Sequence, residues 1–250
     1  MKNTVFISGS ISIKKLPQEV IKSIEKIIEN KIHILVGDAD GIDTLIQDFC
    51  LSKNYSNLTV YSISAIPRYK ASDEFNFKHI FPDESIKKER ARQQEKDKAM
   101  TLESEFTFVI WDGKSKGSYA NLLRALENNK KIKVYNNINK IFLEQSKINK
   151  TEIEYIYREN NGYTASEVVQ YLKDEVIDIF QRTQDLNKYL VENLIIKKDN
   201  NIYIPTNGHE ELFIIDKYRG KTKGIKFKNE FISWIENSLN QSKYRQESLF

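Results

Sequence analysis

Short apolar runs that each end in a polar loop with glycine are the feature that most constrains this fold. TVFIS (4–8), IHILV (32–36) and FTFVIW (106–111) lead into SGSIS, GDADGID and WDGKSKGS. Segments of helical periodicity separate these runs, and such alternation is typical of parallel α/β proteins. The carboxyl ends of parallel strands share one edge of the sheet, where open α/β sheets bind ligands. The sequence therefore predicts a small-molecule site at this edge.

The same alternation continues through residue 136. Strands are expected over 58–63 and 132–135, and helices after Pro17 and over 41–51, 84–104 and 118–129. We therefore expect an α/β fold over residues 1–136, with a Rossmann-like parallel sheet flanked by helices. Residues 137–150 are rich in Asn and Lys and are expected to form a linker.

Residues 151–240 have a different sequence pattern, which predicts mainly helices. Thr164 and Glu167 form a capping-box pattern before one helix, and Thr183 is expected to cap the next. KKDNNIYIPT predicts a hairpin that turns at Asp199–Asn201, and IKFKNEFISWIENSL predicts a final helix. The order helix, helix, hairpin, helix predicts a small winged-helix-like domain. Residues 241–250 are expected to be a frayed tail.

Composition narrows the functional classes. The single cysteine, Cys50, rules out an internal disulfide, fits a reducing compartment and lies on the apolar side of an expected helix, which favours a core position. The three histidines are scattered without cysteine partners, so we expect no metal site. No apolar run approaches the roughly 20 residues of a membrane span, and no signal peptide precedes the first strand, so a cytoplasmic protein is expected.

The polar loops combine two kinds of ligand group. Glycines such as Gly9 and Gly37, and helix starts near Gly41 and Ser118, suit a phosphate. The carboxylates Asp38, Asp40, Asp43 and Asp112 suit ribose hydroxyls or a developing sugar cation, and Arg68, Lys114 and Lys116 would balance the phosphate charge. A nucleotide or nucleotide-derived ligand has both features, and no other cofactor is indicated.

Structural explanations compete at three positions. Asp40 could instead cap the helix that starts at Gly41, and Asp43 could serve only to complement the dipole of that helix. Trp111 is interpreted as a core residue at the sheet edge rather than as a platform for stacking a base.

With these residues in view, the first domain resembles the SLOG superfamily of Rossmann-like nucleotide-binding domains. FISGSISIKKLP, ILVGDADGIDTLIQDF, IPRYK, KDKAM and FVIWDGKSKGSYANLLRAL carry the resemblance, in this order across residues 4–135. Relatives include phosphoribohydrolases, a DNA-processing protein of transformation and sensor domains of anti-phage systems. The resemblance implies a ligand at the same loops and brings Arg92 and Asp97 near it.

The chain departs from the phosphoribohydrolase pattern in one respect. The glutamate that follows the glycine-rich loop in that branch is absent here, where the sequence reads DGKSKGSYANL. Catalysis would then fall to an aspartate. The candidate ligand-binding residues are Ser8, Gly9, Ser10, Gly37, Asp38, Ala39, Asp40, Asp43, Arg68, Arg92, Asp97, Asp112, Gly113, Ser115, Gly117 and Ser118, and the catalytic candidates are Asp38, Asp40 and Asp112.

The second domain resembles the C-terminal domain of phage antirepressors, through SEVVQYL, TQDLNKYLVENLIIKKDNNIYIPT and GIKFKNEFISWI. Lys217, Arg219, Lys221 and Lys223 begin a run of six basic residues, continued by Lys226 and Lys228, with no acid between them. The run could contact phosphates. Residues 151–250 nevertheless hold 14 basic against 16 acidic residues, so a solvated surface, protein contact or dimerisation competes.

Three functions stay open at this point. The first is a ligand sensor, in which the first domain binds a nucleotide derivative and the second passes on the signal or docks a partner. The second is a hydrolase of the N-glycosidic or phosphate bond of a nucleotide, and the third is a DNA-binding protein. A homo-oligomer is compatible with each.

Overall fold

The computed structural model describes residues 3–175, 177 and 179–247, and side chains as far as residue 240. The chain divides into two compact units, Met1–Glu154 and Tyr155–Phe250. Within the described residues, no helix is both long and apolar enough to cross a membrane.

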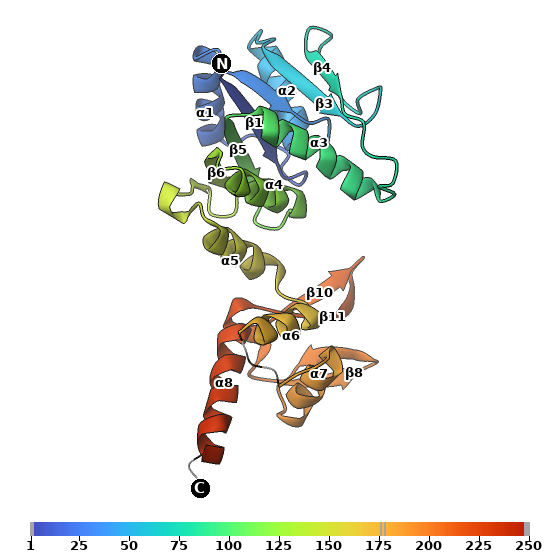
Figure 1. The fold of residues 1–250 in the computed structure, drawn as a ribbon, viewed down its shortest axis with the longest axis vertical. Helices are drawn as coiled ribbons and strands as arrows, with labels where there is room; N and C mark the ends of the chain where they lie inside the picture. Colours follow the sequence, from blue (N-terminus) through green and yellow to red (C-terminus); the bar gives the residue numbers. More distant parts are fainter. Residues whose placement is uncertain (1–2, 176, 178, 248–250) are drawn as a thin grey trace. The chain divides into compact units, whose positions relative to one another are not determined.

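The first unit is built on one sheet with the strand order β4-β3-β2-β1-β5-β6-β7 (Figure 1). Its strands are β1 (Thr4–Gly9), β2 (His33–Val36), β3 (Leu58–Ser62), β4 (Asn76–His79), β5 (Phe106–Trp111), β6 (Lys131–Asn136) and β7 (Ile141–Phe142). All neighbours pair in parallel except β6 and β7. The α/β, Rossmann-like class predicted from the sequence is confirmed here.

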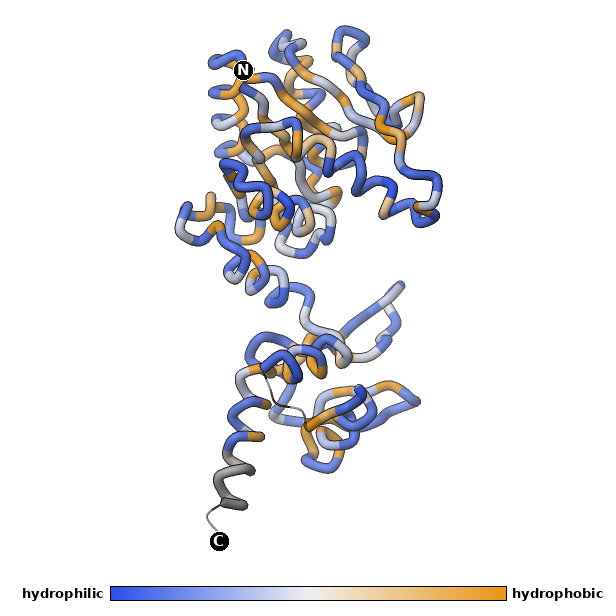
Figure 2. Tube along the Cα trace, in the orientation of Figure 1, coloured by the Kyte–Doolittle hydropathy of each residue, from blue (hydrophilic) through white to orange (hydrophobic). Residues whose placement is uncertain are grey.

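Helices cover both faces of this sheet. On one face, α1 (Gln18–Glu29) and α2 (Ile42–Ser52) pack on alternate strand residues such as Val5 and Ile7. The other face carries α3 (Glu89–Glu103), whose Met100 packs on Phe6, and α4 (Lys116–Glu127). The apolar colour of Figure 2 follows the central strands, as expected for a sheet buried on both sides.

The strand order reverses direction between β1 and β5. From β1 the chain builds outward through β2 and β3, then crosses back by α3 to place β5 on the other side of β1. Loops after β1 and β5 therefore diverge and leave a crevice at the carboxyl edge, the position at which such sheets bind ligands.

The second unit contains helices and two hairpins. After α5 (Lys150–Asn161) come α6 (Ala165–Asp174), α7 (Thr183–Glu192), the hairpin of β8 (Ile196–Asp199) and β9 (Ile202–Pro205), the hairpin of β10 (Phe213–Tyr218) and β11 (Lys221–Phe227), and α8 (Asn229–Glu247). A short 3-10 turn lies at Glu210–Leu212 in this unit, and another lies at Gln145–Lys147 in the first unit. The core of the second unit joins α6, α7 and α8 to Phe213 and Phe227.

In this unit, the predictions that depend on a few neighbouring residues are confirmed at the capping box and the first hairpin, but not at the start of α7. The capping box of Thr164 and Glu167 is present. The hairpin turns where expected, because Asn200 and Asn201 both adopt positive φ. The cap predicted at Thr183 is wrong: Arg182 is the N-cap, and Thr183 is the first helical residue.

Several elements were not predicted. β4 and the hairpin β10–β11 were not predicted, and β7 pairs with β6 inside the segment 137–150 that was expected to be a linker. β7 has only two residues, too few to give a periodic pattern in the sequence. The final helix was predicted to begin at Ile225, but Ile225 to Phe227 belong to β11 and α8 begins at Asn229. Of the expected tail, α8 continues to Glu247 and residues 248–250 lie outside the described residues.

Candidate functional site

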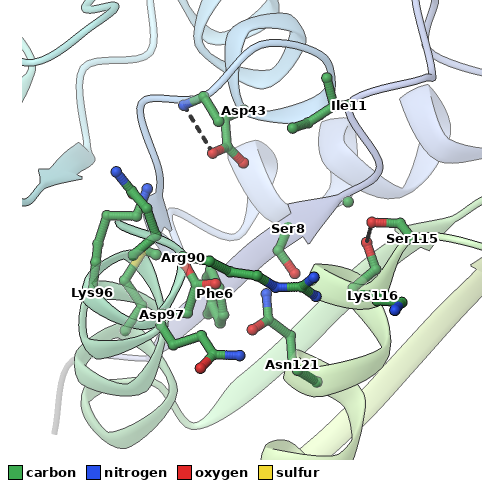
Figure 3. Close-up of a pocket in the computed structure, with 18 of the residues that line it drawn as sticks. Phe6, Ser8, Ile11, Asp43, Arg90, Lys96, Asp97, Ser115, Lys116 and Asn121 are labelled. Atoms are coloured by element: carbon green, nitrogen blue, oxygen red, sulfur yellow. Dashed lines mark hydrogen bonds between the residues drawn. The ribbon is translucent and has the colours of Figure 1, made fainter. Parts of the chain in front are cut away.

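A hollow of about 440 Å³ opens between α3, α4 and the carboxyl end of β1 (Figure 3). It lies on the α3–α4 face of the crevice between β1 and β5. Nine of the candidate ligand-binding residues line it: Ser8, Gly9, Ala39, Asp43, Arg68, Asp97, Ser115, Gly117 and Ser118. Lys116, which was expected to balance a phosphate charge, also lines it, whereas Lys114 does not. The loops after β1, β2, β3 and β5 thus converge as their positions in a parallel sheet require.

Ser8 forms the floor of the hollow together with Phe6. Both residues project from β1 toward the α3–α4 face, because Val5 and Ile7 project to the other. The Ser8 side chain is buried, and its hydroxyl has no hydrogen-bond partner in the part of the chain that the structure describes. Since buried polar atoms are nearly always paired, this hydroxyl is available to a bound molecule.

The beginning of α4 forms one wall. Ser115 is its N-cap, but the side chain makes no capping bond, and Lys116, Gly117 and Ser118 follow along the hollow. The first N–H groups of a helix have no partner within the helix and carry partial positive charge. This wall therefore suits an anion.

Cationic side chains lie along the same hollow. Arg68, Arg90 and Lys116 line it, and Arg90 and Lys116 are exposed without an ion-pair partner among the described residues. The Arg68 guanidinium donates to Gln93 Oε1 at 3.3 Å and to Asp38 Oδ1 at 2.6 Å, and its side chain is 50% exposed. The hollow can therefore neutralise a phosphate.

Asp38 does not line this hollow. Its carboxylate is buried and accepts hydrogen bonds from Ser62 Oγ at 2.7 Å, the Arg68 backbone N–H at 3.1 Å and Lys96 Nζ at 3.0 Å, besides Arg68 Nη2. Burial by itself would raise the pKa of Asp38, but these hydrogen bonds and the Lys96 charge hold it well below its usual range. Both oxygens are occupied, so Asp38 fixes the loop after β2.

Asp43 and Asp97 are the carboxylates that line the hollow. The Asp43 Oδ2 accepts from the Ala39 backbone N–H at 3.2 Å, and burial raises the pKa of Asp43 to about 6 against the opposing charge of Lys96. Burial also raises the pKa of Asp97, which Asn121 contacts by a hydrogen bond. Two carboxylates beside a cationic wall give the hollow both kinds of polar group.

The other predicted acids lie elsewhere. Asp40 is exposed, does not line the hollow and is not a helix cap, because α2 has Gly41 at its N-cap with a φ of 80° and no side-chain capping bond. Asp112 accepts from the backbone N–H groups of Lys114 at 3.0 Å and Ser115 at 2.7 Å, and from Ser12 Oγ. Burial opposes but these bonds lower the pKa of Asp112, which holds the loop before α4.

The remaining predicted residues support the loops. Ser10 Oγ accepts from the Asp112 backbone N–H at 3.0 Å and lies 3.4 Å from Ser118 Oγ. A side chain at Gly37 would lie 2.2 Å from Asp43 Oδ2, so this glycine admits a neighbouring side chain and not a ligand. Ser10, Gly37, Arg92 and Gly113 do not line the hollow.

Apart from Asp97, the α3 residues that line the hollow were not predicted from the sequence. Arg90, Gln93, Gln94, Asp97 and Met100 line the hollow, at spacings that place them on one helix face. Arg92, chosen from the resemblance, lies on another side of the same helix. The spacing from Asp97 and Met100 would have selected Arg90 instead. Phe6, Ile11, Lys96, Ala120 and Asn121 complete the lining.

Two further interpretations are confirmed. Trp111 is fully buried and its Nε1 donates to the Ser115 carbonyl at 3.3 Å, so it is a core residue. Cys50 is buried in the core under α2. Across the described residues, no group of three or more His, Cys, Asp or Glu side chains could hold a metal ion.

Comparison with known proteins identifies no relative. No protein-family model matches the sequence, and neither a curated protein nor a solved structure matches the chain significantly. The function is therefore argued from the hollow itself.

Proposed function

We propose that the first unit binds a nucleotide or nucleotide-derived ligand in the hollow between α3 and α4, and that it serves as a sensing module coupled to the second unit. The observation that carries the proposal is the polarity of the hollow. Arg90, Lys116 and the start of α4 suit a phosphate, and Asp43 and Asp97 suit ribose hydroxyls. The unpaired Ser8 hydroxyl lies on the floor between them.

Two arguments from the chain support this ligand class. The hollow has the size of small-molecule sites and lies at the reversal of the strand order, where such ligands bind in open α/β sheets. The resemblance of the first domain to the SLOG superfamily, and of the second to the phage antirepressor C-terminal domain, leads to the same proposal of a nucleotide sensor with a winged-helix-like partner domain.

A hydrolase acting on the N-glycosidic bond is the second candidate. One observation favours it: Asp43 lines the hollow with a raised pKa, as a general acid requires. Asp38 and Asp112 are committed to loop contacts and Asp40 lies outside the hollow, so the catalytic role would pass to Asp43 with Asp97.

The test is binding of a panel of nucleoside monophosphates and ADP-ribose, measured by thermal unfolding. A member at about 100 times its Kd should raise the Tm of the first unit by about 5 to 10 °C. Arg90→Ala should abolish the shift, whereas Arg92→Ala, on the same helix but outside the hollow, should retain it. Absence of any shift across the panel would refute the proposal.

Product analysis separates the two candidates. A bound nucleotide recovered intact after incubation supports the sensor. Release of a free base or a sugar phosphate, lost in Asp43→Asn and kept in Asp40→Asn, would support the hydrolase instead.

A further inference from the structure

The end of the β10–β11 hairpin concentrates positive charge. Lys217, Arg219, Lys221 and Lys223 fall within seven residues, and all four are exposed. Lys217 pairs with Thr222 and Tyr218 with Lys221 across the ribbon, and a bulge follows Asp216. Because neighbouring strands lie about 4.8 Å apart, the four charges are crowded at one end of a two-stranded ribbon.

Within the part of the chain that the structure describes, no acidic side chain pairs with this group. The hairpin's acid, Asp216, lies 3.9 Å from Lys226, and no acidic residue occurs from Lys217 to Lys228. Among the described residues, none of the four cations has a carboxylate within 4.0 Å. Like charges held together without counter-charge favour a polyanionic partner.

The base of the hairpin packs into the core of the second unit, which fixes the position of the hairpin on that unit. Phe213 and Phe227 are buried and their ring centroids lie 5.4 Å apart in an edge-on arrangement. Tyr163 bridges to Phe227, and Gly162 packs so closely that a Cβ there would lie 2.8 Å from the Lys226 side chain. In Figure 1 the hairpin projects from the body of the second unit, and its end is blue and pale in Figure 2.

Tyr218 adds a planar surface among the cations. Tyr218 is 59% exposed, and the Arg219 guanidinium lies 5.3 Å from its ring centroid. Exposed aromatic rings among cations are the groups on which nucleic-acid bases stack. The segment KYRGKTK holds no aliphatic side chain that would insert into a bilayer, and a ribbon of two strands is narrow enough for the major groove.

We propose that the end of the β10–β11 hairpin binds nucleic acid, with Lys217, Arg219, Lys221 and Lys223 contacting phosphates and Tyr218 contacting a sugar or an unpaired base. The hairpin belongs to the second unit, and this proposal does not depend on the ligand proposed for the first. The net negative charge of the rest of this unit confines the contact to the hairpin and predicts moderate, salt-sensitive affinity.

The test uses the full chain and fluorescence anisotropy with a short labelled DNA duplex and its single strand. Four phosphate contacts predict that log K falls with log salt with a slope of about −3.6 on the duplex. The quadruple variant K217A/R219A/K221A/K223A should lose at least tenfold in affinity and most of the slope, and each single variant should reduce the slope by about 1. Circular dichroism establishes that each variant is folded.

Matched variants distinguish binding at this hairpin from attraction of DNA to other basic residues of the chain. Lys197→Ala with Lys198→Ala, on the β8–β9 hairpin, should leave the affinity unchanged. Tyr218→Leu should weaken single-strand binding at least about fivefold and duplex binding less. An unchanged affinity of the quadruple variant, or tighter binding to polyglutamate or to anionic vesicles than to either DNA, would overturn the proposal.

Discussion

The Lys96 ammonium lies 3.0 Å from the Asp38 carboxylate, and both side chains are almost completely buried. This ion pair joins the middle of α3 to the loop after β2, across 58 residues of sequence. Arg68 binds the same carboxylate from the loop after β3. Three segments that form the walls of the hollow are therefore held by one buried carboxylate.

Removal of this carboxylate should destabilise the protein strongly. Asp38→Ala removes the carboxylate that pairs with the buried Lys96 ammonium and with Arg68, and breaking a buried pair in this way costs about 3 to 5 kcal/mol. Chemical denaturation should show this loss in the free energy of unfolding. Asp40→Ala, two residues away and exposed, is the control and should change it by less than about 0.5 kcal/mol. Equal stability of the two variants would contradict the structural role of Asp38.

Asp43 should make the stability of the protein depend on pH. Its pKa is raised by burial to about 6 in the folded chain, from the ordinary value of 3.8, so between these values the folded state holds a proton that the unfolded state has lost. Stability should accordingly fall as pH rises from about 4 to 6, by at most about 3 kcal/mol.

The measurement is the difference in unfolding free energy between wild type and Asp43→Asn at a series of pH values. Because the asparagine cannot ionise, the stability of the variant relative to the wild type should increase as pH rises toward 6. Above pH 6 the difference should stay constant. A difference that stays flat from pH 4 to 7 would show that Asp43 titrates normally.

Gly37→Ala should disturb the site through a steric contact. The added methyl group would lie 2.2 Å from Asp43 Oδ2 and 2.9 Å from Lys96 Nζ, and overpacking of this kind costs about 1 to 3 kcal/mol. Gly117→Ala is the matched control, since the nearest atom would be 4.0 Å away and alanine favours the helix. Thermal unfolding should show a lower Tm for Gly37→Ala and an unchanged or slightly higher Tm for Gly117→Ala.

The capping box of α6 should contribute measurably to the second unit. Thr164→Ala removes the side-chain acceptor for the Glu167 backbone N–H and should cost about 1 kcal/mol. Thr183→Ala, at the first helical position of α7, removes no cap and should be nearly neutral. Denaturation followed by the fluorescence of Trp234, which packs on this core, compares the two. Equal losses would show that Thr183 has a role the structure does not assign.

Local sequence patterns were sufficient to predict the order of the strands and helices in the first unit, apart from β4 and β7, and the edge at which its loops meet. Both follow from local patterns, because apolar alternation, glycine punctuation and the geometry of parallel strands act over a few residues. For the same reason Ser8, Gly9 and the residues from Ser115 to Ser118 were placed at the site from spacing alone.

Tertiary packing selects which aspartate of the loop after β2 and which arginine of α3 line the hollow. The segment GDADGID contains three aspartates that the local sequence does not distinguish. Only contacts with Arg68 and Lys96, 30 and 58 residues away, bury Asp38 and leave Asp43 at the hollow. Similarly, the rotation of α3 on the sheet, fixed by Met100 against Phe6, places Arg90 at the hollow instead of Arg92. The choice among the aspartates depends on the packing of distant segments, whereas Arg90 could have been selected from its helical spacing to Asp97 and Met100.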